Sequence, residues 1–378
     1  MVRYLTMIGK TTRPEPVLRY RRVRANGSQT FVQVISEQAL NLTEESKMMN
    51  ALQLTLACGN YDRTRALLDG SVKPEGIQLI YLPLSPEEVF FRMIRFKEFD
   101  VAEMSLSSYL LNRSRGGTDF IAIPVFPSRM FRHSSIYVYG PSGIEKPGDL
   151  IGKRVGVPEY QVTAAVWARG ILQHEYGVSP KQITWFTGGL EHPGREEKIP
   201  LSLPPSIKIS QISPEKTLSR MLEKGEIDAL IAPRPPSSYK DGTGDVKRLF
   251  KDYKEEEIRY YQKNEIFPIM HTVVIQQALY KSHPWVAQSL YKAFCLAKEV
   301  CFQNLTDDAA LKYSLPWLVS EVKQTKKILG EDFWPYGIEK NLKVIQTLMQ
   351  YSAEQGLIKK GLKIEQIFAR NTLEAFKV

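Results

Sequence analysis

Residues 126–139 read Phe-Pro-Ser-Arg-Met-Phe-Arg-His-Ser-Ser-Ile-Tyr-Val-Tyr, and residues 266–275 read Ile-Phe-Pro-Ile-Met-His-Thr-Val-Val-Ile. Each stretch sets Phe-Pro before polar residues that include one histidine, and each continues into a β-branched and aromatic run typical of a strand. Two matched strands predict a chain that leaves one lobe, builds a second lobe and returns. Ligands usually bind in the cleft between such lobes. We therefore expect His133 and His271 to face each other there.

The composition is that of an ordinary globular protein with room for two lobes. The chain has 378 residues, of which 43% are hydrophobic and 24% are charged, and this length suits two domains or one bilobed unit. No apolar run approaches the roughly 20 residues that a membrane span needs. The net charge of +10 fits an anionic small ligand without specifying one. We expect no nucleic-acid partner, because the sequence has no basic helix, zinc spacing or aromatic RNA-binding motif.

The cysteines and the N-terminal segment point to a reducing compartment. The three cysteines, Cys58, Cys295 and Cys301, are too few and too scattered for a disulfide framework or a structural zinc site. Residues 1–50 lack the apolar core of a secretory signal, so we expect a cytoplasmic protein. We interpret residues 1–50 as a flexible extension ahead of the first convincing strand.

Strands and helices alternate along most of the chain, which predicts a parallel α/β arrangement. We call residues 126–139 and 266–275 the first and second hinge stretches. The strands expected before the first hinge stretch are residues 52–58, 77–82, 100–105 and 120–125. Those expected after it are residues 155–157, 183–186 and 226–232. Beyond residue 275 the sequence is mostly helical, and residues 190–206 contain four prolines that predict an irregular loop.

Several blocks carry a resemblance to a known family. Phe-Arg-His-Ser-Ser at 131–135, Phe-Pro-Ile-Met-His at 267–271, His-Pro-Trp-Val at 283–286 and Asp-Phe-Trp-Pro-Tyr-Gly at 332–337 resemble the 4,5-dihydroxyphthalate decarboxylase family. Other blocks, such as Leu-Ile-Gly-Lys-Arg-Val-Gly-Val-Pro-Glu at 150–159, follow the type II periplasmic-binding-protein fold. The resemblance runs from about residue 51 to the C-terminus and leaves residues 1–50 unmatched.

The resemblance implies a fold class and a division of the chain. The fold would be α/β, with two lobes joined by two crossover strands and a helical C-terminal part. Lobe one would comprise residues 51–138 together with 268–378, and lobe two would comprise residues 139–267.

The resemblance also implies a carboxy-lyase that removes carbon dioxide from a hydroxylated aromatic (di)carboxylic acid without a cofactor. A phenol para to the carboxylate pushes electron density to the ring carbon that bears it, and an acid protonates that carbon. The protein then needs a base, an acid and cations for the carboxylates. Histidine suits both proton roles because its pKa lies near neutrality, and arginine binds carboxylates through its planar fork.

The hinge stretches supply the leading candidates for this chemistry. We expect His133 and His271 to be the catalytic acid and base, although hydrogen-bonded structure is the alternative for each. Arg129 and Arg132 lie just before His133 as candidate carboxylate ligands, with a structural salt bridge as the alternative. Alternation along a strand would send Arg132 and His133 to opposite sides, which makes Arg129 the better ligand.

Residues that follow the strands supply further candidates, because ligands of open α/β sheets bind beyond the carboxyl ends of the strands. In lobe two, Arg234 is placed to clamp an anion, and Glu159 to orient a histidine or accept a hydrogen bond from a phenol. Glu103 and Ser105 hold the same position in lobe one. Thr163 begins a helix whose free backbone donors would bind a carboxylate. For each, a structural role is the alternative.

Two alternatives stay open at this point. A metal site from His133, His271 and Glu103 or Glu159 is conceivable, but the spacing matches no metal motif, and we expect no metal. The same cleft would also suit a solute-binding protein of a transporter that captures an aromatic anion. Paired histidines favour the enzyme, since a binding protein has less use for them. The sequence names no particular substrate and leaves self-association open.

Overall fold

A computed structural model describes residues 18–22, 32–36, 51–240, 244–359 and 361–374. One compact unit comprises residues 54–75 and 79–378, and a second takes in residues 1–53 with 76–78. In the second unit, β1 (Leu18–Arg22) pairs with β2 (Val32–Ser36) in antiparallel fashion. The expectation of a flexible extension over residues 1–50 otherwise lies outside the described residues.

A five-stranded sheet contains the second hinge stretch and the beginning of the first. Its order is β4-β3-β5-β13-β6, and β13 pairs antiparallel with both β5 and β6. Residues 126–129 of the first stretch therefore lie beside β13, whereas the strand expected after His133, residues 136–139, belongs to the other sheet and does not pair with β13. The strands are β3 (Leu52–Cys58), β4 (Ile77–Pro83), β5 (Val101–Ser105), β6 (Phe120–Arg129) and β13 (Ile269–Gln276).

Strand directions bring several chain segments to one edge of this sheet. β3 and β5 are parallel, and β6 runs the same way because β13 is antiparallel to both β5 and β6. The carboxyl ends of β3, β5 and β6 therefore meet the amino end of β13. This is the kind of edge at which α/β sheets bind ligands.

A six-stranded sheet is built by the intervening part of the chain, in the order β10-β9-β8-β11-β7-β12. β8 is parallel to β9 and β11, whereas β7 is antiparallel to β11 and β12. The strands are β7 (Ile136–Tyr139), β8 (Arg154–Val157), β9 (Thr184–Thr187), β10 (Lys208–Gln211), β11 (Ala229–Ile231) and β12 (Val246–Arg248). Because β7 belongs to this sheet, the chain changes sheets between Arg129 and Ile136, slightly ahead of residue 139.

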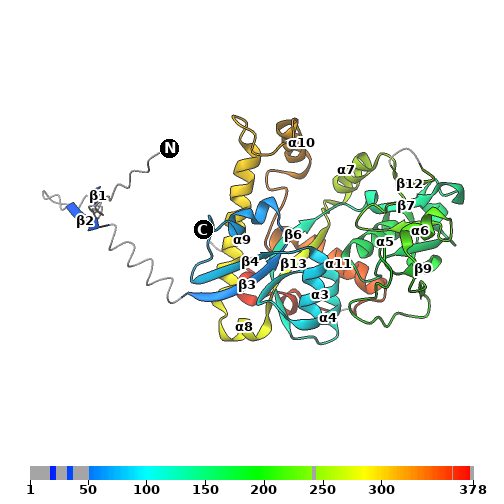
Figure 1. Ribbon diagram of the computed structural model, residues 1–378, viewed down its shortest axis with the longest axis horizontal. Helices are drawn as coiled ribbons and strands as arrows, with labels where there is room; N and C mark the ends of the chain where they lie inside the picture. Colours follow the sequence, from blue (N-terminus) through cyan, green and yellow to red (C-terminus); the bar gives the residue numbers. More distant parts are fainter. Residues whose placement is uncertain (1–17, 23–31, 37–50, 241–243, 360, 375–378) are drawn as a thin grey trace, which may run out of the picture. The chain divides into compact units, whose positions relative to one another are not determined.

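The expected α/β class with two sheets and a helical C-terminal part is confirmed, and Figure 1 shows both sheets with their helices. No helix among the described residues is long and apolar enough to cross a membrane. The helices are α2 (Arg65–Leu68), α3 (Pro86–Phe96), α4 (Leu106–Ser114), α5 (Thr163–Tyr176), α6 (Leu218–Glu223), α7 (Tyr253–Asn264), α8 (Gln277–Ser282), α9 (Trp285–Thr306), α10 (Leu318–Leu329), α11 (Leu342–Glu354) and α12 (Ile364–Ile367).

Helix α5 connects the part of the chain that forms the six-stranded sheet to β13 and to the C-terminal helices. The indole N–H of Trp167 donates to the carbonyl oxygen of Ile269 at 2.9 Å, and the guanidinium of Arg169 donates to Gln355 Oε1 at 2.9 Å. α5 also packs on α11. A Cβ at Gly170 would lie 1.9 Å from the ring of Tyr351 on α11, so this crossing needs a glycine.

We predict that Gly170→Ala destabilises the protein. The added methyl group overlaps the ring of Tyr351, and overpacking of this kind typically costs about 1–3 kcal/mol. Urea denaturation followed by circular dichroism would measure the free energy of unfolding. Gly148→Ala is the control, because nothing lies within 4 Å of a Cβ there. Equal stability of both variants would show that α5 and α11 do not meet as described.

Candidate active site

A histidine and a glutamate meet on one face of the five-stranded sheet. In the register of β13 with β5, His271 lies opposite Ser105 and Val273 lies opposite Glu103. Residues directly opposite each other share a face, and diagonal neighbours are within reach of long side chains. The His271 Nδ1 accordingly lies 2.6 Å from Glu103 Oε1. Glu103 is completely buried, whereas the His271 side chain is 17% exposed.

The loop after β3 completes the environment of the Glu103 carboxylate. The Tyr61 hydroxyl donates to Oε1 at 2.8 Å, and the Gly59 N–H donates to Oε2 at 2.9 Å. Burial opposes ionisation of Glu103, but the charge of His271 and these hydrogen bonds prevail and lower its pKa. An ionised Glu103 only accepts hydrogen bonds. His271 must therefore carry a proton on Nδ1.

The outer nitrogen of His271 is left available. Among the described residues, His271 Nε2 has no hydrogen-bond partner. The ring of Phe90 on α3 stands edge-on to the imidazole, with ring centroids 4.8 Å apart and an interplanar angle of 81°. Phe90 and Glu103 hold the ring from two sides, so Nε2 is an oriented group that can take or give a proton.

Two further predicted residues meet beside this pair. Ser105 Oγ lies 2.9 Å from Thr163 Oγ1, and the Ser107 N–H donates to the same Thr163 oxygen at 3.0 Å. Thr163 is the first residue of α5, and Ser105 lies opposite His271 in the sheet register. The structure therefore brings together four of the predicted residues: Glu103, Ser105, Thr163 and His271.

His133 does not join this group, which corrects the expectation of two facing histidines. It lies in a 3₁₀ turn, His133–Ser135, rather than in a strand. Its ring centroid is 5.2 Å from that of Phe250 and 5.3 Å from that of Tyr260, the latter on α7. The residue is 1% exposed, and both ring nitrogens lack partners among the described residues. A buried imidazole under α7 does not open into a cleft.

The residues considered for a metal site, His133, His271 and Glu103 or Glu159, likewise do not come together. Among the described residues, the aromatic rings around His133 are those of Tyr176, Phe250 and Tyr260, and His271 and Glu103 are not part of this cluster. Within the described ranges, no group of three or more His, Cys, Asp or Glu side chains is arranged to hold a metal ion.

Arg129 and Arg132 are buried and contact backbone oxygens, a sulfur atom and the polar side chains of Asn341 and Ser135. Arg129 donates to the carbonyl oxygens of Phe267 at 3.0 Å and of Pro335 at 2.7 Å. Arg132 Nε lies 3.1 Å from Met270 Sδ. Burial lowers the pKa of Arg129 to about 9 and that of Arg132 to about 10. In this structure both side chains tie the hinge together, and neither contacts Glu103 or His271.

Arg234 lies on the surface. Its guanidinium donates to Glu87 Oε2 on α3 at 2.8 Å, and the two side chains are 64% and 39% exposed. The residue follows β11 as expected, but its partner is a carboxylate of the protein. The pair joins the loop after β11 to α3.

Glu159 is buried and neutralised by cations of the proline-rich loop. Arg195 Nε donates to Glu159 Oε1 at 2.8 Å, and the Lys198 ammonium contacts the same oxygen. All three residues line a hollow with an open volume of about 720 Å³, whose opposite wall includes Phe91 on α3. Arg195 and Lys198 were missed by sequence reasoning, because an irregular loop has no periodicity to place its side chains.

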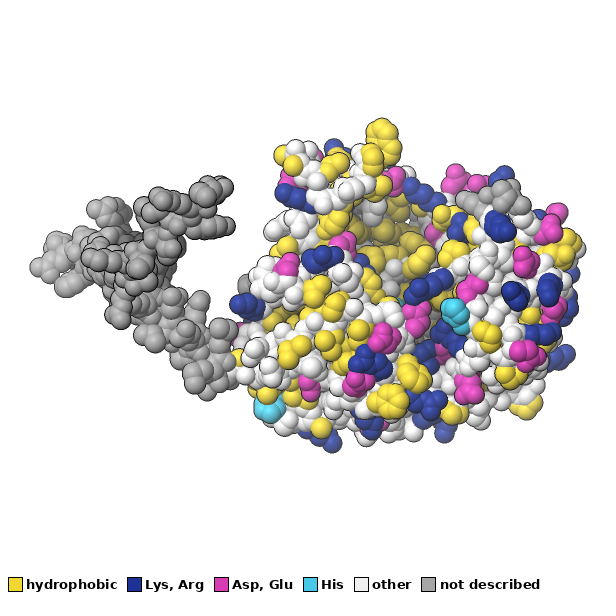
Figure 2. Space-filling model, viewed as in Figure 1, with side chains coloured by type: hydrophobic (Ala, Val, Ile, Leu, Met, Phe, Trp, Pro, Cys, Tyr) yellow, Lys and Arg dark blue, Asp and Glu magenta, His cyan; other side chains and the backbone are white. Residues whose placement is uncertain are grey.

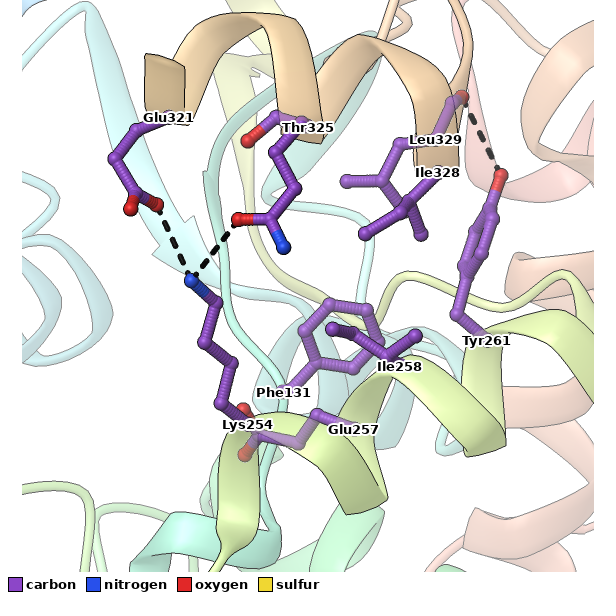
Figure 3. A pocket seen from close by; sticks show the side chains of 10 residues that line it. Phe131, Lys254, Glu257, Ile258, Tyr261, Glu321, Thr325, Ile328 and Leu329 are labelled. Atoms are coloured by element: carbon purple, nitrogen blue, oxygen red, sulfur yellow. Dashed lines mark hydrogen bonds and ion pairs between the residues drawn. The ribbon is translucent and has the colours of Figure 1, made fainter. Parts of the chain in front are cut away.

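A separate hollow with an open volume of about 490 Å³ lies between α7 and α10. Figure 3 shows Phe131, Ile258 and Ile328 converging on its apolar floor. Lys254 crosses the rim and donates to Glu321 Oε2 at 3.2 Å. Figure 2 shows hydrophobic side chains gathered inside a hollow on this face of the molecule. None of the residues predicted for the site lines it.

Two curated relatives are clearly similar in sequence. The chain is 42% identical to a 4,5-dihydroxyphthalate decarboxylase of Comamonas testosteroni over 330 residues, which are 87% of this chain and 100% of the relative. It is 46% identical to a 4,5-dihydroxyphthalate decarboxylase of Pseudomonas putida over 211 residues, which are 56% of this chain and 82% of the relative. No protein-family model matches the chain.

Solved structures with similar folds are far more distant. An Archaeoglobus fulgidus protein aligns with a TM-score of 0.48 and 14% identity over 81% of this chain and 98% of its own. A periplasmic sulfonate-binding protein of Methylobacillus flagellatus aligns with a TM-score of 0.48 and 12% identity over 86% of this chain and 93% of its own. Likenesses of this size do not bear on activity.

We predict that His133 makes the protein sensitive to mild acid. Burial lowers the pKa of its imidazole to about 4, whereas an unfolded chain has a value of about 6.5. The unfolded state therefore binds this proton more readily, and the free energy of unfolding falls as the pH drops from about 6.5 to 4, by on the order of 3 kcal/mol. His133→Phe removes the titration and should flatten this dependence.

Urea denaturation at pH 7 and pH 5 measures the effect. His192→Gln, a change at an exposed histidine, is the control and should behave like the parent. Parallel loss of stability in the parent and in His133→Phe would contradict the buried, neutral histidine.

Proposed function

The chain belongs to the 4,5-dihydroxyphthalate decarboxylase family and is a carboxy-lyase, and we propose that it decarboxylates 4,5-dihydroxyphthalate with His271 as the proton-exchanging group. The observation that carries this proposal is the pair formed by Glu103 and His271 at the edge where the carboxyl ends of β3, β5 and β6 meet the amino end of β13. A transport protein that only captured an anion would have little use for an oriented histidine with a free nitrogen.

The chemistry of the substrate fits an acid–base site. In 4,5-dihydroxyphthalate each carboxylate has a hydroxyl group para to it. Electron density from that hydroxyl makes the carboxyl-bearing ring carbon basic, so a proton adds there. The bond to the carboxylate then breaks, its electrons restore the aromatic ring, and carbon dioxide leaves. One proton is consumed per carboxylate lost, and the product is 3,4-dihydroxybenzoate. We propose that no cofactor takes part, because the para hydroxyl supplies the electrons.

His271 Nε2 is the atom that we propose exchanges the proton. Glu103 holds the opposite nitrogen, fixes the tautomer and stabilises the imidazolium, as a buried carboxylate does for a catalytic histidine elsewhere. A general acid or base in this position contributes roughly 10²–10⁴-fold. Ser105 and Thr163 lie beside the pair, and the amino end of α5 offers backbone donors for a carboxylate of the substrate.

The proposal is tested by incubating the protein with a panel of hydroxylated aromatic carboxylates and measuring carbon dioxide. We expect release from 4,5-dihydroxyphthalate and none from phthalate, which lacks the para hydroxyl. Tight binding of these acids without product, with and without added divalent metal, would instead identify a solute-binding protein.

We predict that His271→Asn lowers kcat by roughly 10²–10⁴-fold, because the amide preserves hydrogen bonding but cannot titrate. Substrate binding, measured by calorimetry, should survive. His174→Asn is a matched control: His174 also pairs with a glutamate, Glu354, at 2.6 Å, but on α5 away from the sheet edge. Its turnover should equal that of the parent. Turnover of His271→Asn within about threefold of the parent would remove His271 from the reaction.

We predict that Arg234→Ala raises KM at most about fivefold, because an exposed ion pair contributes little. Glu87→Ala breaks the same pair and should have the same effect. Steady-state kinetics on both variants decides the matter. A large rise in KM for Arg234→Ala alone would show that Arg234 holds the substrate and that its contact with Glu87 is exchanged on binding.

A further inference from the structure

We propose that Tyr61 is a positioning residue for the acid–base pair, so that Tyr61, Glu103 and His271 act as one hydrogen-bonded chain. This inference rests on the proposed function of His271. Nothing in the sequence links Tyr61 to the histidine, since the two residues stand far apart in the chain, and the connection runs through the buried carboxylate.

Both oxygens of Glu103 are held. Oε1 accepts from Tyr61 at 2.8 Å and lies 2.6 Å from His271 Nδ1. Oε2 accepts from the Gly59 N–H at 2.9 Å and lies 3.5 Å from Cys58 Sγ. With partners on both oxygens, the carboxylate cannot rotate without breaking a bond in a buried place, which is costly. The direction of the His271 ring follows from the direction of this carboxylate.

Gly59 is what lets Tyr61 reach the carboxylate. A Cβ at Gly59 would lie 2.5 Å from Cζ and 2.7 Å from the hydroxyl oxygen of Tyr61, so the ring of Tyr61 folds back over position 59. A second tyrosine secures the same loop. The Tyr81 hydroxyl donates to the Gly59 carbonyl oxygen at 2.7 Å and lies 2.9 Å from Thr64 Oγ1.

The ring of Tyr61 is also fixed by a cation. The guanidinium carbon of Arg63 lies 4.3 Å from the centroid of Tyr61 and 4.2 Å from that of Trp334. Trp334 in turn donates through its indole N–H to the Phe126 carbonyl oxygen on β6 at 2.9 Å. The Asp-Phe-Trp-Pro-Tyr-Gly block at 332–337, singled out in the sequence, thereby connects the loop after β3 to the hinge.

The groups around the carboxylate come from neighbouring segments. Cys58 ends β3, Tyr61 and Arg63 follow it in the chain, and Tyr81 lies on β4, where its hydroxyl contacts Gly59 and Thr64. Removing the Tyr61 hydroxyl takes away one of the two contacts that hold Oε1, so the carboxylate can turn away from His271 Nδ1.

The test is Tyr61→Phe, with Tyr81→Phe as the matched control. Both lose one tyrosyl hydroxyl beside Gly59, but the Tyr81 hydroxyl does not bond to Glu103. For Tyr61→Phe we expect kcat to fall roughly ten- to a hundredfold, the scale of a lost hydrogen bond to a charged group, with KM within threefold. For Tyr81→Phe we expect no such split of kcat from KM.

A second readout does not depend on turnover. Nitrogen NMR of the ¹⁵N-histidine-labelled protein, with the His271 signals assigned by their loss in His271→Asn, reports which ring nitrogen carries the proton. We expect a single tautomer protonated at Nδ1 in the parent and a mixture in Tyr61→Phe. The same single tautomer in both proteins would overturn the inference. Failure of the parent to release carbon dioxide would overturn the proposed function instead, while the NMR comparison would still decide the role of Tyr61.

Discussion

The hydrogen bond between His271 and Glu103 depends on the return of β13 into the first sheet. β13 lies between β5 and β6 and runs against both. Along the chain, the six-stranded sheet follows β6, and β13 then returns to the first sheet. This return places His271 beside the Glu103 carboxylate of β5. The acid–base pair is therefore a product of the whole topology, and no local segment could form it.

β13 also anchors the part of the chain that forms the six-stranded sheet. Trp167 on α5 donates to the backbone of Ile269 on β13, and Thr163 at the start of α5 meets Ser105 beside the register position of His271. Contacts that join α5 to the five-stranded sheet thus converge on the residues next to His271. Binding of a substrate there would be coupled to how these parts close on each other.

Much of the fold was predictable from the sequence, because clear hydrophobic periodicity identifies most of the strands and helices. The shared pattern of the two hinge stretches identified both strands but not their partners, since β7 and β13 lie in different sheets. The environment of His133 was not foreseen, because half of the residues of α7 are charged and Tyr260 is its one buried residue, so this helix lacks an apolar stripe. The roles of Arg129 and Tyr61 could not be foreseen, since each depends on partners far away in the chain, such as Pro335 and Glu103.

We propose that a substrate reacts against His271 at the edge of the five-stranded sheet. A crystal structure of the His271→Asn variant with 4,5-dihydroxyphthalate bound would test this directly. We expect the side chain at position 271 to lie about 3–3.5 Å from either a carboxyl-bearing ring carbon or its para hydroxyl, the range of a reactive approach. A ligand seated instead in the apolar hollow between α7 and α10, with no contact to position 271, would contradict it.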